Sequence, residues 1–264
     1  PLTKALIFSS WSMVPDASAA LLPYEAERRM GGGESGRRYF EQHRLRPLQF
    51  RQDHGRLAGL RALLLIYPSP ALAELADPLA VFSETGATLS LEGMRSAVGD
   101  RLKPALGALK EGAVSHQDAQ STEWAAPAMI DDLLGARSRA WLEAPHGMRA
   151  LASEDAFHDH IAELAAAVRT RHIGASSDDL SDLLVDVALG SPAVCALRAL
   201  KRISPELAWD DPRLLSAAAE VAWSFRALFN QHDAVALLRR DTDDHYWRRV
   251  LAYCAQHNLQ AVLD

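Results

Sequence analysis

The spacing of apolar and polar positions changes twice along the chain. Residues 4–10 form a short apolar run that ends in two serines, which predicts a strand buried on both faces in a parallel sheet. A helix should follow, because Ser12 can cap it and Pro15 suits its first turn. The apolar stripe of this helix consists of Val14, Ala17, Leu21 and Leu22. The start of the chain therefore predicts a β-α unit.

A glycine-rich loop separates this unit from the rest of the chain. Pro23 should kink or end the first helix, because proline lacks the backbone donor and clashes with the preceding turn. Residues 31–36 then read Gly-Gly-Gly-Glu-Ser-Gly, which is typical of a flexible linker. We therefore expect a β-α segment at 1–30, an Arg/Gly-rich linker at 31–56 and a helical domain at 57–264.

Beyond residue 57 the pattern is helical almost throughout. Residues 57–67 form an apolar element, and a break follows in which Ser69 should cap a helix and Pro70 should occupy its first position. Pro, Gly, Asp or Ser signals delimit further helices at 71–75, 94–111, 127–143, 154–171, 178–189, 191–203, 212–229, 231–240 and 243–257. No fixed repeat period holds across three segments. The prediction is a mainly α fold, an irregular helical array or bundle with a short N-terminal β-α element.

Composition is that of an ordinary globular protein. Of 264 residues, 48% are hydrophobic and 23% are charged, which argues against wholesale disorder. Two cysteines cannot form a disulfide framework, and no leader-like pattern opens the sequence. No apolar run approaches the roughly 20 residues of a membrane span. We expect a soluble, cytoplasmic protein without a membrane partner.

Basic residues are concentrated in one stretch. The net charge is −6, yet residues 28–61 hold nine arginines and only three acids. This stretch could follow the phosphates of DNA, and Tyr39, Phe40 and Phe50 could stack on bases. The candidate nucleic-acid-binding residues are Arg37, Arg38, Arg44, Arg46 and Arg51. The alternative is a solvated loop in a chain that uses arginine in preference to lysine.

Candidate catalytic and metal-binding residues have simpler structural interpretations. His158 and His160 lie two positions apart, so a helix would point them to different faces, and an exposed helical turn is the favoured interpretation over a metal site. Cys195 and Cys254 have no neighbouring histidine, which favours small buried side chains over nucleophiles. The sequence predicts no catalytic and no metal-binding residue.

Paired acids and tryptophans also fit structural roles. The acidic turns at 178–179, 210–211 and 241–244 each precede a helical segment, where aspartate caps free amides. The tryptophans lie among alanine and leucine at helical spacing, which favours core positions. These core tryptophans are Trp124, Trp141, Trp209, Trp223 and Trp247.

The first strand and helix resemble a known family. The run Lys4-Ala5-Leu6-Ile7-Phe8-Ser9-Ser10-Trp11, with Val14-Pro15-Asp16 and a helix that ends near Tyr24, resembles the start of the C-terminal RecA-like lobe of superfamily 2 helicases and Swi/Snf-type translocases. The later run at 65–70 is similar to bacterial helicase-related proteins that carry a long insertion in this lobe. The resemblance implies that Phe8, Ser9, Ser10 and Trp11 lie near the cleft or the nucleic acid.

The resemblance implies an ATP-dependent parent protein, but this chain lacks the parts that hydrolyse ATP. No glycine-rich loop ending in Gly-Lys-Ser/Thr, no helicase-type Asp-Glu pair and no arginine-finger segment occurs in the sequence. Phosphoryl transfer needs groups of these three kinds around the phosphates and magnesium. The expectation is that ATP and magnesium bind elsewhere in the parent, and that this chain holds no cofactor and is not catalytically competent alone.

Three functions remain open at this point. The leading hypothesis is a fragment of a DNA helicase or translocase whose helical insertion contacts DNA through residues 28–61, the remaining helicase lobes or a partner protein. The alternative is a stand-alone α-helical scaffold or protein-interaction domain, in which case the first strand is coincidental. A small-molecule enzyme with a pocket between helices ranks last, because no convergent set of titratable residues is visible.

Overall fold

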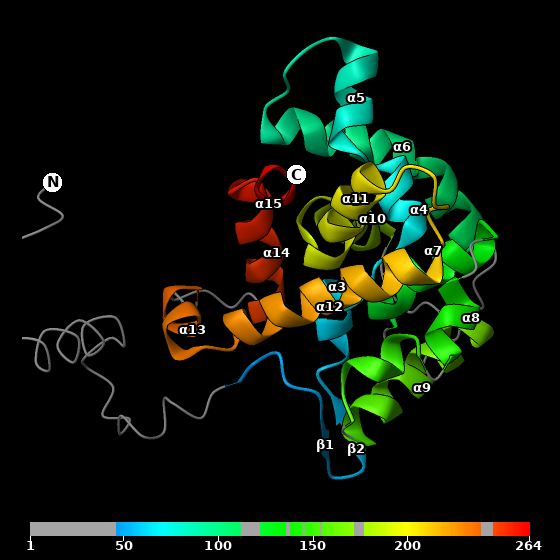
Figure 1. Cartoon of the computed structure of the whole chain (residues 1–264), viewed down its shortest axis with the longest axis vertical. Helices are drawn as coiled ribbons and strands as arrows, with labels where there is room; N and C mark the ends of the chain where they lie inside the picture. The colour runs from blue at the N-terminus through cyan, green and yellow to red at the C-terminus, as the bar shows by residue number, and fades with distance from the viewer. Residues whose placement is uncertain are drawn as a thin grey trace, which may run out of the picture.

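The protein folds into a mainly α structure, as predicted. A computed structural model describes residues 46–111, 122–135, 138–144, 146–153, 155–171, 177–238 and 245–264 (Figure 1). The predicted strand at 4–10, its helix and the glycine-rich loop lie outside these residues. Within them, helices pack around one apolar core, and the β structure is a two-stranded antiparallel hairpin.

The elements follow one another with short connections. The first half comprises β1 (Arg51–Asp53), β2 (Arg56–Ala58), the 3-10 turn η1 (Leu60–Ala62), α3 (Leu63–Ile66), α4 (Pro70–Leu75), α5 (Pro78–Thr85) and α6 (Leu91–Glu111). The second half comprises η2 (Glu123–Ala125), α7 (Ala126–Leu133), α8 (Ser138–Glu143), η3 (Met148–Leu151), α9 (Asp155–Thr170), α10 (Ser177–Gly190), α11 (Pro192–Ile203), α12 (Pro212–Phe229), α13 (His232–Leu238), α14 (Tyr246–Gln256) and α15 (Leu259–Leu263).

Several helices begin where local sequence rules place them. Ser69 accepts a hydrogen bond from the Leu72 amide at 3.2 Å, and Pro70 follows at the first helical position of α4. Asp211 caps α12 in the same way, by accepting from the Arg213 amide at 2.9 Å. Both caps satisfy amides that have no intrahelical partner. The predictions of a cap at Ser69 and at Asp211 are confirmed.

Helix α11 lies at the centre of the core. It packs against α12, α15, α4 and α10, and Figure 1 shows α10 and α11 surrounded by the other helices. The side chains from Pro192 to Ala199 are all buried. Gly190, at the end of α10, allows the close approach of α14, because a Cβ there would lie 2.3 Å from the Leu251 carbonyl oxygen. The core therefore joins segments that are far apart in sequence.

Two predicted elements differ from the structure. The helix expected at 127–143 is divided into α7 and α8, because Gly135 adopts a left-handed φ of 78° and an α-helix cannot continue through it. The apolar element at 57–67 is not uniform either, since it contains β2, η1 and α3. In both cases glycine (Gly135 and Gly59) marks the break.

Among the described residues, no individual helix has both the length and the hydropathy of a membrane span. Residues 179–190 and 192–203 pass such a test only as a pair, and the two segments are bent by 48° relative to each other. Both belong to the buried centre of the helical domain.

Candidate nucleic-acid and protein interfaces

The predicted site residues are divided between described and undescribed parts of the chain. Phe8, Ser9, Ser10 and Trp11, which carry the helicase resemblance, lie outside the described residues, and so do Arg37, Arg38 and Arg44. Arg46 and Arg51 are described, and both are exposed to solvent. The structure therefore locates the C-terminal end of the predicted basic stretch.

That end forms the β1–β2 hairpin. The strands pair antiparallel with Arg51 opposite Ala58 and Asp53 opposite Arg56. His54 and Gly55 make the turn with φ values of 48° and 76°, the two positive φ angles of a type I′ turn. Arg51 and Arg56 are exposed, and Figure 1 shows the hairpin projecting from the helical body beside α9. A projecting basic hairpin can approach an extended polyanion.

A buried histidine ties this hairpin to the helical body. The His160 Nε2 atom lies 2.9 Å from the Ala58 carbonyl oxygen, and the side chain is fully buried. The expectation of an exposed turn at 158–160 is therefore wrong for His160. The carbonyl at the end of β2 requires a polar partner beneath it, and α9 provides that partner from its inner face.

Phe50 belongs to an aromatic cluster in the core. Its ring centroid lies 5.0 Å from that of Phe157 and 6.0 Å from that of Trp223, on which it stacks. The side chain is buried, so Phe50 is not available to stack on a nucleic-acid base, as the sequence had suggested. The guanidinium of Arg226 contacts both rings, 3.8 Å from the Trp223 centroid and 5.3 Å from that of Phe50.

The chain enters the domain at the C-terminal end of α12. The Leu48 amide donates to Asn230 Oδ1 at 3.0 Å, and Arg226 Nη1 donates to the Leu48 carbonyl oxygen at 2.9 Å. Leu48 itself is buried in the core, although the sequence placed it in the linker. These contacts fix the point at which the chain joins the helical domain, just after residues 1–45.

An apolar groove lies next to this entry point. It has a volume of about 670 Å³ and runs between α12, α13, α14 and α15. Large apolar side chains are exposed along it, including Leu237 at 57% and Val262 at 74%. Its lining consists of Phe225, Leu228, Phe229, Gln231, Asp233, Ala234, Leu237, Leu238, Tyr253, Cys254, His257, Leu259 and Val262. Clustered exposed apolar side chains of this kind mark interaction sites.

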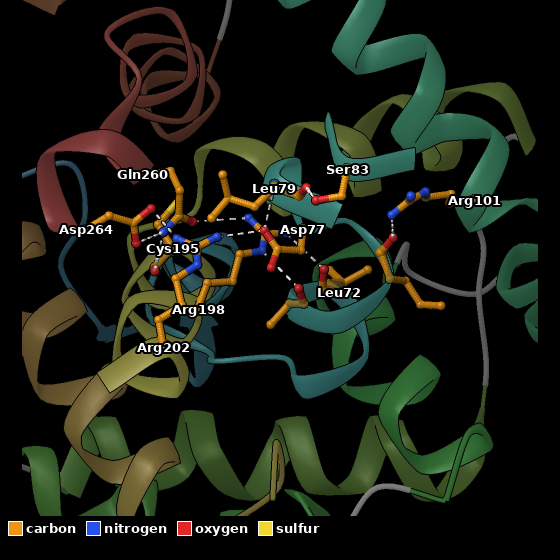
Figure 2. Close-up of polar contacts among 12 residues, drawn as sticks. Leu72, Asp77, Leu79, Ser83, Arg101, Cys195, Arg198, Arg202, Gln260 and Asp264 are labelled. Carbon is orange, nitrogen blue, oxygen red and sulfur yellow. Dashed lines mark hydrogen bonds and ion pairs between the residues drawn. The ribbon is translucent and has the colours of Figure 1, made fainter. Parts of the chain in front are cut away.

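Arg198 is a buried cation without a predicted role. Its side chain is fully buried in α11, where it donates to the carbonyl oxygens of Leu72 at 3.0 Å and Ala73 at 2.9 Å (Figure 2). Burial lowers the pKa of Arg198, but a guanidinium keeps its charge in proteins. The fixed fork of donors therefore satisfies carbonyls near the C-terminal end of α4, where a positive charge also suits the helix dipole.

One turn further along α11, Arg202 forms ion pairs. It contacts Asp77 at 2.7 Å and also pairs with Asp264, as Figure 2 shows. Asp77 is also the N-cap of α5, where it accepts from the Leu79 amide at 3.0 Å. Arg202 therefore connects the start of α5 to the end of α15. This arrangement positions helices, and both of its carboxylates are engaged in ion pairs with Arg202.

Asp131 is a buried acid in α7. Tyr67 Oη donates to its Oδ2 at 2.8 Å, while Ser69 Oγ and the Ala71 amide donate to its Oδ1 at 2.9 and 2.8 Å. Burial raises the pKa of Asp131 to about 7, although these three hydrogen bonds act in the opposite direction. Because all three donors precede or begin α4, Asp131 fixes the chain at the start of that helix.

The remaining candidate groups have structural roles. Cys195 and Cys254 are buried, and burial raises their pKa values to about 11 and about 12, so the expectation of small buried side chains is confirmed. Hydrogen bonds from Arg213 lower the pKa of Asp211 to about 2, as its capping role requires. The predicted core tryptophans are buried or packed against the core. Among the described residues, no group of three or more His, Cys, Asp or Glu side chains could hold a metal ion.

Comparison of the chain with protein-family models, with curated proteins and with solved structures finds no match. The resemblance to a helicase lobe rests on residues 4–11 of the sequence and stays a prediction. Within the part of the chain that the structure describes, the basic hairpin and the apolar groove are surfaces with a chemical character of their own.

Proposed function

We propose that the chain is part of a DNA helicase- or translocase-type ATPase, in which the helical domain makes a non-catalytic contact with DNA. The resemblance of residues 4–11 to a motor lobe suggests the parent protein. The projecting hairpin is the observation that carries the contact, because it presents Arg51 and Arg56 to solvent at the end of a nine-arginine stretch. ATP and magnesium would bind to other parts of the parent.

The charge distribution supports the hairpin over other surfaces. Many arginines of the helical body are paired with carboxylates of the same chain, so their field is largely neutralised. These pairs include Arg95–Asp186, Arg101–Glu84, Arg139–Asp132, Arg169–Glu143, Arg171–Asp132 and Arg213–Asp211. Arg51 also has an acid nearby, Asp53 at 3.5 Å, but both side chains are exposed and screened by solvent. Residues 28–56 therefore form the part of an acidic protein best suited to phosphates.

Binding of single-stranded and duplex DNA across a salt series tests this proposal. The double substitution Arg51→Ala, Arg56→Ala should weaken binding and reduce the salt slope by up to about 2, since each duplex phosphate contact contributes about 0.9 to it. Changing Arg37, Arg38, Arg44 and Arg46 together should have a larger effect in the same direction.

The matched control is Arg169→Ala with Arg213→Ala, which removes the same charge from exposed, carboxylate-paired positions. Equal losses in the control and the hairpin variant would show a general charge effect. No binding by the wild-type chain at low salt would contradict the proposal.

The second candidate function is a protein-interaction domain. The apolar groove between α12 and α15 favours it, because exposed apolar side chains converge there beside the chain entry point. The two functions use different surfaces, so a helical insertion could serve both.

A further inference from the structure

The apolar groove needs an occupant. Leu228, Leu237, Tyr253 and Val262 are exposed large apolar side chains, and all of them line the groove. Their neighbours Phe225, Phe229 and Leu259 form its floor and walls. A groove of this character suits an amphipathic helix that inserts an apolar stripe, the binding mode in which residues at i, i+3, i+4 and i+7 act as anchors.

We propose that this groove binds the N-terminal segment of the same chain, residues 12–22. The sequence predicts a helix there, and Val14, Ala17, Leu21 and Leu22 form its stripe at the spacing a groove requires. The predicted stripe and the groove are both apolar and lie in one chain. The groove lining contains one acid, Asp233, so an apolar stripe is the feature that it would recognise.

The tether between segment and groove has a suitable length. The chain enters the domain at Leu48, which is hydrogen-bonded to Asn230, and Phe229 and Gln231 on either side of Asn230 line the groove. Residues 23–47 connect Leu22 to Leu48, and a random coil of about 25 residues spans roughly 25–30 Å on average. A random-coil tether of this length gives a local concentration on the order of 1 mM, so even weak intrinsic affinity keeps the groove occupied.

The contact would have a consequence for the parent protein. Residues 1–30 are the predicted start of a motor lobe, and the groove belongs to the helical domain. Because the same stripe would face the sheet of that lobe, docking in the groove and packing in the lobe would exclude each other. The inference does not depend on DNA binding, which uses the hairpin instead.

Hydrogen exchange of the full chain tests the docking from the segment side. Leu21→Asp with Leu22→Asp places two charges on the stripe, and no described helix contains these residues, so the domain should still fold. If the groove is occupied about nine-tenths of the time, amides of α13 and α15 should exchange up to about tenfold faster in this variant. Amides of α11 should not change. The matched control is Ala19→Asp with Ala20→Asp, which adds the same charge away from the stripe and should leave exchange unchanged.

Substitutions in the groove test the same contact from the other side. Val262→Asp should speed exchange within residues 12–22, whereas Ile203→Asp should not, because Ile203 is equally exposed at 77% but lies outside the groove. Exchange at α13 and α15 that is unaffected by the Leu21 and Leu22 changes would overturn the proposal. A concentration-dependent dimer that Val262→Asp abolishes, with residues 12–22 unaffected, would assign the groove to a second copy and also overturn it.

Discussion

Replacing Arg198 by methionine tests whether a buried cation organises the centre of the fold. Methionine fills a similar volume but cannot donate hydrogen bonds. The change would remove the donors to the carbonyl oxygens of Leu72 at 3.0 Å and Ala73 at 2.9 Å, and a longer contact of 3.5 Å to Gln260. Both carbonyls are buried beneath α11, so water could not replace the guanidinium without opening the core.

Two opposing effects set the magnitude. The Ala73 carbonyl would lose its donor, which should lower the free energy of unfolding by about 1–3 kcal/mol, whereas the Leu72 carbonyl still accepts from the Ala76 amide at 3.2 Å. Removing the buried charge recovers part of its desolvation penalty, which is why an apolar replacement of a buried ion can approach neutrality. Here no apolar group replaces the acceptors, which are backbone atoms, so the loss should prevail. We expect Arg198→Met to lower the free energy of unfolding by about 1–3 kcal/mol.

Urea unfolding monitored by far-UV circular dichroism measures this change. The midpoint should fall while the slope with denaturant stays constant, because the surface exposed on unfolding is similar. Arg213→Met is the matched control, since Arg213 is 73% exposed and its ion pair with Asp211 lies at the surface, so its midpoint should not move measurably. An Arg198→Met protein as stable as wild type would refute the idea that these carbonyls depend on the guanidinium.

Two further predictions concern buried positions. The pKa of Asp131 is raised to about 7 in the folded state, so the group favours folding below about pH 4 and this contribution is lost as the pH rises through 7. In the wild type, the free energy of unfolding should therefore fall by up to about 1.4 kcal/mol per pH unit because of this group between pH 5 and 7.5. Asp131→Asn should remove this fall, and equal slopes in the two proteins would contradict the argument. Gly190→Ala should lower the melting temperature, because its Cβ would lie 2.3 Å from the Leu251 carbonyl oxygen. Gly107→Ala in α6 has open space at the Cβ and should raise the melting temperature slightly; the opposite order would refute the close-approach argument.

Local rules were sufficient for the fold class and for several helix starts. Ser69 with Pro70, and Asp211 with Pro212, combine a side-chain acceptor with a residue suited to the first helical turn, so each start is determined within four residues. The division of 127–143 into two helices was missed, although Gly135 was visible, because a single glycine is often tolerated inside a helix. Its left-handed φ is a consequence of packing that the local sequence does not contain.

Whether an individual side chain is buried depends on segments that are distant in the sequence. His160 and Phe50 looked suitable for exposed roles, yet His160 meets the carbonyl of Ala58, 102 residues away in sequence. Phe50 stacks on Trp223 in the same region. An aromatic side chain can stack on a base or on another side chain with similar chemistry. Only the tertiary arrangement decides between the two.

Arg198 was nevertheless open to inference from the sequence. Apart from Arg198, every residue from Pro192 to Leu200 is apolar or small. A helix there therefore has no polar face on which an arginine could be exposed. A cation in such a helix must find buried acceptors, and backbone carbonyls at a helix C-terminus are typical unsatisfied acceptors in a helical protein.

The same reasoning gives only half of the answer for α7. Asp131 and Asp132 are adjacent in an apolar helix, and one must be more buried than the other. Asp131 binds the start of α4, whereas Asp132 pairs with Arg139 and Arg171 at the surface. The choice between them depends on helix rotation, which the apolar pattern on both sides leaves undetermined.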